Sequence, residues 1–262
     1  MICFAAITPH TPLLIPGVGK ENVAKLDATT SALTHLEGEL YASHPDVIVV
    51  ISSHAIQHED AFSLNLHDEY VIDFKDFGDL ATSRILQPDI ELASAIESHM
   101  HERTVPFTLD SSLNVDYGTG VPLYFLTQNL PHAKIVPLSF SGLPAKEHVR
   151  FGTELKDVFE RSLKRIAVVA SGDLSHCLSS DAPLGYKPEG SEYDKKVVEA
   201  VKGISTSGLL SMNTKLLEGA SACIHEQLLI LFGILERKKT RVEILSYEHP
   251  FGVGYLVAQI HL

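Results

Sequence analysis

The sequence predicts an α/β protein, a three-layer αβα sandwich built around a mixed, mostly parallel sheet. Short runs of apolar, β-branched residues, such as Asp46–Ile51 (DVIVVI), are typical of strands that are buried on both faces of a sheet. These runs alternate along the chain with amphipathic stretches of helical spacing. Such alternation predicts strands that are connected by helices, with the helices packed on both faces of one sheet.

Each predicted element follows from one of these two patterns. The expected strands are Ile2–Ile7, Asp46–Ile51, Ile135–Phe140, Ile166–Ala170, Val242–Leu245 and Val253–Ile260. The expected helices are Asn22–Ala42, Asp89–Arg103, Val121–Leu130, Ala145–Leu163, Glu192–Val201 and Ala222–Glu236. In Ala61–Phe77, Phe62 and Leu64 alternate with polar residues, which predicts an added antiparallel piece and hence a mixed sheet. No repeat or linker divides the sequence, so we expect a single domain over residues 1–262.

Composition excludes several classes of protein. The chain has 262 residues, of which 45% are hydrophobic and 21% charged, so it can form a sizeable core and is not expected to be disordered. Its net charge is −12, from 21 basic and 33 acidic residues. Proteins that bind nucleic acids or anionic membranes need clustered basic side chains, so we expect neither partner.

Cysteine usage and the apolar segments suggest a cytoplasmic protein. Three scattered cysteines are too few for a disulfide framework, and no CxxC pair indicates a structural zinc site. The apolar run near the first residue is broken by Pro9 and Pro12, unlike a signal peptide. No stretch reaches the roughly 18 apolar residues that a membrane-spanning helix needs.

Histidine is the unusual residue, with 14 copies, and three of them directly follow expected strands. His10 follows the first strand, His54 follows Asp46–Ile51, and His176 follows Ile166–Ala170 in the run Ser-Gly-Asp-Leu-Ser-His. Ligands of open α/β sheets bind at the carboxyl ends of the strands. We therefore expect these three histidines to lie at one edge of the sheet.

Two imidazoles and a third ligand form a chemically sensible metal site, because imidazole binds Zn, Cu, Ni and non-haem Fe. The candidates for the third ligand are Cys223 and Glu226, three residues apart at the start of the expected helix Ala222–Glu236. The helix register is expected to deliver one of them and not both. His176 would then be a free acid or base, with Asp173 nearby to orient it. Taken alone, Cys223 is also typical of a small buried hydrophobe, and Asp173 of a helix N-cap.

Several motifs, in order along nearly the whole chain, resemble the LigB-like superfamily, the catalytic subunits of class III extradiol dioxygenases. Within it the chain is most similar to the Memo-type domain of AmmeMemoRadiSam proteins. The resemblance implies an αβα fold with a metal at the carboxyl edge of the sheet. In the dioxygenase members it implies Fe(II), two histidines and a glutamate, with another histidine as acid and base, for the cleavage of catechol-type rings. The motifs are Pro9–Gly19 (PHTPLLIPGVG), Ile51–Ala55 (ISSHA), Ala170–His176 (ASGDLSH) and Ser246–Ala258 (SYEHPFGVGYLVA).

By position, the resemblance makes His10 and His54 the metal histidines and His176 the catalytic one. It leaves the third ligand open. Memo-type relatives place a Cys-Gly where Cys223 stands, whereas ring-cleaving relatives have a His-Glu pair that resembles the pair ending at Glu226.

The sequence departs from the ring-cleaving pattern at Tyr117, which precedes Gly118 where those relatives have His-Gly. We take Tyr117 and Gly118 as candidate substrate-binding residues, since a glycine there permits close approach of the backbone.

Two functions follow from these residues. The first is an extradiol-type ring-cleavage dioxygenase that uses Fe(II) and O₂ on a small catecholic or related aromatic substrate. The alternative is a Memo-like metal-binding protein with an interaction or radical-SAM-associated role and no ring cleavage. A carboxylate as third ligand favours Fe(II), whereas a thiolate favours Zn or Cu. The sequence leaves open the substrate, the metal and whether two copies form a homodimer.

Overall fold

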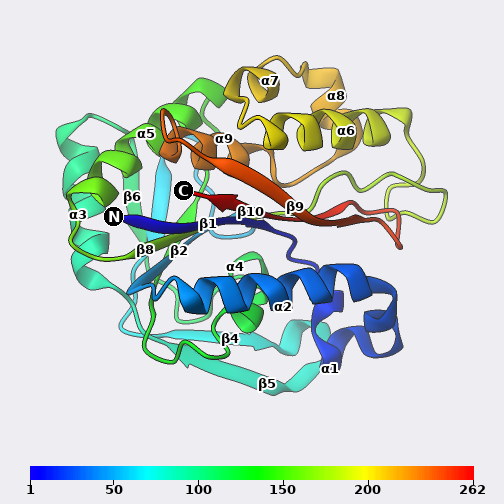
Figure 1. Ribbon diagram of the computed structural model, residues 1–262, viewed down its shortest axis with the longest axis horizontal. Coiled ribbons are helices and arrows are strands. Elements are labelled where there is room, and N and C mark those ends of the chain that lie inside the picture. Colours follow the sequence, from blue (N-terminus) through cyan, green and yellow to red (C-terminus); the bar gives the residue numbers. More distant parts are fainter.

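The computed structural model describes residues 1–262 and has an eight-stranded mixed sheet with the order β6-β3-β7-β2-β8-β1-β10-β9 (Figure 1). Four neighbouring strands at its centre run parallel. They are β7 (Lys134–Ser139), β2 (Val47–Ser52), β8 (Ile166–Ser171) and β1 (Ile2–Thr8). These are the most continuous apolar runs of the sequence, and all but a few of their residues are buried, as expected for central strands.

Antiparallel pairs occur on both sides of this parallel centre. On one side β3 (Phe62–Asn65) pairs antiparallel with β7, and β6 (Phe107–Asp110) pairs parallel with β3. On the other side β10 (Tyr255–His261) pairs antiparallel with β1, and β9 (Arg241–Glu248) forms the edge. The antiparallel piece expected within Ala61–Phe77 is thus confirmed for β3.

A separate two-stranded ribbon lies outside the main sheet and was not expected as such. It consists of β4 (Tyr70–Phe74) and β5 (Asp79–Leu86), and the alternating burial of β4 buries Ile72 against the helices. Side chains of β5 are mostly exposed between its ends, so its sequence lacks the apolar alternation that identifies a strand.

Helices cover both faces of the sheet, which confirms the three-layer αβα arrangement (Figure 1). Successive residues of β1 face opposite layers: Ala5 and Ile7 pack with one set of helices, and Phe4 and Ala6 pack with the other. The first set is α3 (Ile90–Glu102), α5 (Ala145–Arg161), α6 (Pro188–Lys202), α7 (Thr206–Leu210), α8 (Thr214–Ala220) and α9 (His225–Ile234). The second set is α2 (Asp27–Ala42) and α4 (Tyr117–Leu126), preceded by the short α1 (Pro16–Gly19).

Of the six expected helices only α5 begins at the expected residue, and the shifted starts of α4 and α9 bear on the candidate site. Helix α4 begins at Tyr117 because the Asp116 carboxylate caps it, accepting a hydrogen bond from the Thr119 N–H at 3.0 Å. Helix α9 begins at His225, so Cys223 lies in the turn between α8 and α9. The expectation that Cys223 lies on the first turn of a helix is wrong, and it therefore does not share a helical face with Glu226.

Helix α9 packs directly against α5, and this contact fixes its position above the sheet. Two glycines allow the helices to approach each other closely. A Cβ atom at Gly152 would lie 2.1 Å from the Ile230 carbonyl oxygen, and a Cβ atom at Gly233 would lie 2.3 Å from the Val149 carbonyl oxygen. Larger residues would force the two helices apart. The turn that carries Cys223 is therefore attached to a firmly packed helix.

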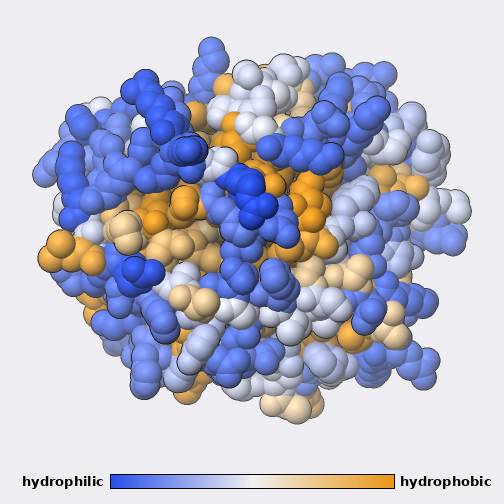
Figure 2. All heavy atoms as spheres, in the orientation of Figure 1, coloured by the Kyte–Doolittle hydropathy of each residue, from blue (hydrophilic) through white to orange (hydrophobic).

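The face drawn in Figure 1 is mostly hydrophilic around its rim, with apolar side chains gathered near its centre, where the β1–β10–β9 edge of the sheet lies (Figure 2). No single helix of the structure has the length and the apolar composition needed to cross a bilayer. Helices α8 and α9 reach that length and composition only together, and they are bent by 117°.

Candidate metal centre

Three potential metal donors converge at the carboxyl edge of the parallel strands. His10 follows the end of β1, His54 follows the end of β2, and Cys223 approaches from the turn before α9. The Nε2 atoms of His10 and His54 lie 3.2 Å apart, and Cys223 Sγ lies 3.3 Å from His10 Nε2. All three donor atoms lie within 4.8 Å of one another.

These separations fit a shared metal ion. Imidazole nitrogens bind a metal at about 2.0–2.1 Å and thiolate sulfur at about 2.3 Å, so donors around one ion lie roughly 3–3.6 Å apart. The two measured donor separations, 3.2 and 3.3 Å, fall in this range. His10 is 2% exposed, whereas His54 is exposed, so the cluster is open to solvent on the His54 side.

The His10 ring is oriented by a chain of hydrogen bonds on its far side. The Ser171 hydroxyl donates its only hydrogen to the Gly118 carbonyl oxygen, so it accepts from His10 Nδ1, 3.3 Å away. This arrangement places the proton of the neutral ring on Nδ1 and the lone pair of Nε2 toward His54 and Cys223. Such outer hydrogen bonds fix the tautomer of metal-binding histidines.

The His54 imidazole is positioned by Tyr117. The Tyr117 ring stacks on that of His54 with centroids 4.2 Å apart, and the Tyr117 hydroxyl lies 2.8 Å from His54 Nε2. Burial, with the nearby acidic groups, raises the pKa of the Tyr117 hydroxyl to about 12, so it keeps its proton at neutral pH. It can therefore donate a hydrogen bond to an acceptor at the metal centre.

Asp173 connects the other two donors. Its carboxylate accepts a hydrogen bond from the His10 backbone N–H at 3.0 Å, and its own N–H donates to Cys223 Sγ at 3.2 Å. The Cys223 N–H in turn donates to the Asp173 carbonyl oxygen at 3.1 Å. Burial raises the pKa of the Asp173 carboxyl to about 6, against the opposing effect of the His10 N–H. Asp173 thus holds His10 and Cys223 in place, and no hydrogen bond joins it to His176.

The protonation states of the two histidines are suited to the binding of a cation. Burial lowers the pKa of His10 to about 3, and burial with the neighbouring His10 charge lowers that of His54 to about 4. Both rings are therefore neutral at pH 7, and each has one nitrogen with a lone pair, that of His54 Nε2 lying beside the Tyr117 hydroxyl. Burial raises the pKa of the Cys223 thiol to about 12, so a metal ion would have to displace its proton.

His176 lies near this cluster with a free ring nitrogen. It lies close enough to His10, His54 and Asp173 to influence their pKa values, and its backbone N–H donates to the Ala220 carbonyl oxygen at 3.1 Å. Its Nδ1 is buried without a hydrogen-bond partner. The ring nitrogen that a ligand can reach is Nε2, which also has no hydrogen bond and is not buried, so it is the atom suited to proton transfer.

Glu226 lies apart from the three converging donors. It lines a cavity of about 390 Å³ together with Tyr193 and His225. Burial raises the pKa of its carboxyl, and the structure gives it no place in the set formed by His10, His54 and Cys223.

Gly118 is needed where the backbone of α4 meets the metal centre. A Cβ at this position would lie 2.5 Å from Ser52 Oγ, 2.9 Å from an Asp116 carboxylate oxygen and 3.4 Å from His10 Nδ1. The Ser52 hydroxyl donates to that Asp116 carboxylate, so the contact has no freedom to relax without breaking a hydrogen bond. The glycine therefore keeps a polar layer behind His10 closely packed.

The substitution Gly118→Ala is expected to weaken metal binding by about 10–100-fold, the effect typical of disturbed outer-shell partners. Titration against a competing chelator measures it. Gly120→Ala on the same helix is the control, because the nearest atom to its Cβ, Ile72 Cγ2, lies 3.3 Å away. Equal metal affinity for the two folded variants would contradict the role given to Gly118.

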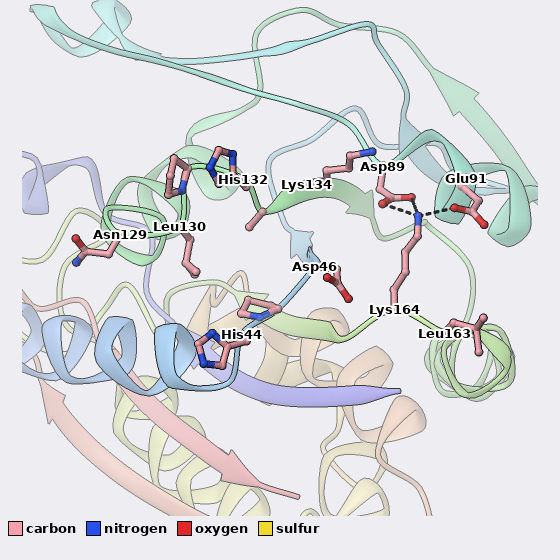
Figure 3. A pocket seen from close by; sticks show the side chains of 13 residues that line it. His44, Asp46, Asp89, Glu91, Asn129, Leu130, His132, Lys134, Leu163 and Lys164 are labelled. Atoms are coloured by element: carbon pink, nitrogen blue, oxygen red, sulfur yellow. Dashed lines mark hydrogen bonds and ion pairs between the residues drawn. The ribbon is translucent and has the colours of Figure 1, made fainter.

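A larger cavity, about 690 Å³, lies at the opposite edge of the sheet, at the amino ends of β2, β7 and β8 (Figure 3). Its charged groups are engaged with one another: Lys164 Nζ lies 2.7 Å from an Asp89 carboxylate oxygen and 2.8 Å from one of Glu91. His44 and His132 project from separate walls and do not converge. This cavity lacks the converging donors of the carboxyl edge.

Sequence analysis identified the donors but missed the polar layer behind them. Asp116 caps α4 and accepts from the Ser52 hydroxyl, and Ser171 orients His10. The spacing of Asp116 and Thr119 is a capping signal that could have located the start of α4. No sequence signal links Ser52 or Ser171 to these partners, because the contacts join residues that lie far apart along the chain.

Comparisons with known proteins identify the family of this chain. The sequence profile described as "Catalytic LigB subunit of aromatic ring-opening dioxygenase" matches residues 4–258. Protein CA_C1420 of Clostridium acetobutylicum is 32% identical over 97% of this chain and 56% of its own length. Proteins of Mycobacterium sp. and Klebsiella pneumoniae, each named "2,3-dihydroxyphenylpropionate/2,3-dihydroxicinnamic acid 1,2-dioxygenase", are 26% identical over 64% of this chain and 55% and 54% of their own lengths. The chain spans about half the length of these curated relatives.

A solved structure has the same fold. The uncharacterized protein JW3007 from Escherichia coli K12 superposes with a TM-score of 0.68 at 18% sequence identity, covering 99% of this chain and 100% of that one. Because the LigB profile covers nearly the whole chain, the protein belongs to the LigB family of aromatic ring-opening dioxygenase catalytic subunits.

Proposed function

We propose that the protein is a non-haem, Fe(II)-dependent dioxygenase of the extradiol type that cleaves the ring of a small catecholic substrate with O₂. His10, His54 and Cys223 would hold the metal. The observation that carries this proposal is the convergence of three donor atoms within 4.8 Å, beside a histidine whose Nδ1 has no partner. Family membership and the names of the Mycobacterium and Klebsiella relatives support the reaction type.

The metal would supply the Lewis acidity that lowers the pKa of a catechol hydroxyl and the redox chemistry that O₂ requires. His176 takes a proton from the second hydroxyl of the substrate at its free ring nitrogen and later returns it. Tyr117, which keeps its proton at neutral pH, donates a hydrogen bond toward developing negative charge. Gly118 keeps the backbone of α4 close to Ser52 and His10, so its contribution is to the packing behind the metal donors and not to contact with the ring.

Asp173 acts on the reaction through its neighbours. Its carboxylate and backbone hold His10 and Cys223 in register, so its contribution is to position the donors. Because His176 has no hydrogen bond to Asp173, its ring can turn toward the substrate.

One observation favours a second function, that of a Memo-like metal-binding protein without ring cleavage. The third donor beside the two histidines is a thiol, whereas ring-cleaving relatives use a carboxylate. A thiolate favours softer metals such as Cu or Zn over Fe(II). In that case the protein would keep the metal but act through a partner, as in proteins associated with radical-SAM enzymes.

Metal analysis of anaerobically purified protein, followed by O₂ uptake with substituted catechols, tests the two functions. The proposal expects about one iron per chain and O₂ uptake coupled to a yellow ring-opened product. Bound Cu or Zn without O₂ uptake on any catechol, also after reconstitution with Fe(II), would favour the second function. Protein without affinity for any of these metals would contradict both.

A further inference from the structure

A cavity of about 310 Å³ adjoins the candidate metal centre, and His54 and Asp116 form the wall that the two share. Its size leaves ample room for the substituent of a small aromatic ligand. Its thirteen lining residues include three aspartates, Asp76, Asp110 and Asp116, and no lysine or arginine.

Two of the three carboxylates, those of Asp116 and Asp110, are held in place by their own contacts. Asp116 is fixed by Ser52 and by the first turn of α4. Asp110, at the end of β6, is largely buried, and both of its oxygens contact His58 Nε2, at 3.0 and 3.2 Å. Asp76 is exposed at the rim, in the single turn Lys75–Phe77 between β4 and β5.

No basic side chain offsets them inside the cavity. The lysine closest in sequence, Lys75, pairs with Asp73 at 2.9 Å and does not line the cavity. His58 contacts Asp110 but does not line the cavity either. A ligand in this space therefore meets carboxylates and neutral polar groups.

Aromatic side chains connect the metal centre with the rim of the cavity. Phe77, next to Asp76, packs edge-on against Tyr117 with ring centroids 5.3 Å apart, and Tyr117 stacks on His54. A substrate whose diol faces the metal donors would direct a substituent from this aromatic surface toward the aspartates.

We infer that this cavity takes the ring substituent of the substrate, and that it selects an ammonium-bearing catechol over a carboxylate-bearing one. The binding of the diol at the metal rests on the proposed function. The preference for a positively charged substituent rests on the cavity alone. In a partly closed cavity a carboxylate substituent would be repelled by three aspartates, whereas an ammonium group would be attracted and hydrogen-bonded. The Mycobacterium and Klebsiella relatives are named for dihydroxyphenylpropionate, which carries a carboxylate. This chain would thus act on a substrate of opposite charge.

The test measures binding rather than turnover. The affinities of 2-(2,3-dihydroxyphenyl)ethylamine and 3-(2,3-dihydroxyphenyl)propionate are compared by calorimetry on protein loaded with redox-inert Zn(II). The same comparison with phenethylamine and 3-phenylpropionate, which lack the diol, is made on metal-free protein. We expect the ammonium compound to bind at least tenfold more tightly in each pair, with the difference falling as salt is added.

Variants assign the effect to the cavity. Asp110→Asn and, separately, the exposed Asp76→Asn should each reduce the ammonium preference at least threefold, whereas Asp157→Asn on α5, outside the cavity, should leave it unchanged. Equal affinities, or tighter binding of the carboxylates, would overturn the inference. If the diols bind no better to Zn(II)-loaded protein than the phenyl compounds bind to metal-free protein, the proposed function fails. The relative affinities of phenethylamine and 3-phenylpropionate would then still test the charge preference of the cavity independently.

Discussion

Replacing Cys223 by alanine is expected to lower the affinity for the metal by more than about 100-fold, beyond the 10–100-fold that outer-shell partners contribute. The thiol is the third donor within 4.8 Å of the two imidazoles, so its removal leaves a two-histidine site. Competition with a chelator measures the affinity. Co(II) reconstitution adds a spectroscopic readout. The unsubstituted protein should show a thiolate-to-metal band, and this band should be absent from the Cys223→Ala variant.

Three further variants make this result specific. Glu226→Gln should retain full affinity, because Glu226 faces a different cavity. Cys177→Ala controls for loss of a buried thiol, since Cys177 Sγ hydrogen-bonds only to the Gly219 and Ala220 carbonyl oxygens. Cys223→Asp should recover part of the affinity while losing the thiolate band. If Glu226→Gln loses the metal and Cys223→Ala retains it, Glu226 and not Cys223 is the third metal ligand.

The second large effect is expected for His176→Gln, which should lower kcat on the best catechol by about 10²–10⁴-fold, the contribution typical of a positioned acid or base. Metal content and catechol affinity should change little, because His176 makes no hydrogen bond to the donors. Stopped-flow measurement of ring-opened product gives kcat, and equilibrium titration of anaerobic protein gives the affinity.

Two comparisons separate proton transfer from a structural effect. His132→Gln, an exposed histidine at the opposite edge of the sheet, should leave kcat unchanged. Added imidazole should restore part of the activity of His176→Ala, because the small base can occupy the vacated space. A loss of metal from His176→Gln, or unchanged kcat, would remove His176 from the proposed reaction.

The central part of the fold could be predicted because its strands are buried on both faces. Runs such as Ile166–Ala170 consist of apolar and small residues and are as short as typical strands. Strand β6 could not be found in this way, since it has four residues and its side chains are only partly buried. Helices α7 and α8 are short and follow polar turns, so neither is long enough to show the apolar periodicity by which a helix is recognised in a sequence.

At the candidate site, the rule that ligands bind at the carboxyl ends of strands was sufficient to bring His10 and His54 together. It could not choose between Cys223 and Glu226, because that choice depends on the residue at which α9 begins. Helix α9 begins two residues after Cys223, which places the thiol in a turn held by Asp173. Packing between α5 and α9 sets this arrangement, and such tertiary packing leaves no local pattern in the sequence.

The donors come from opposite ends of the chain, and this has a consequence for when the metal can bind. His10 and His54 are separated by 44 residues, and His10 and Cys223 by 213. Bringing them together closes very large loops, and β1 must first be inserted between β8 and β10. The unfolded or partly synthesised chain therefore has no preformed chelate. The ion can be captured only by the finished fold, so metal acts as a ligand that stabilises the native state and not as a template that guides folding.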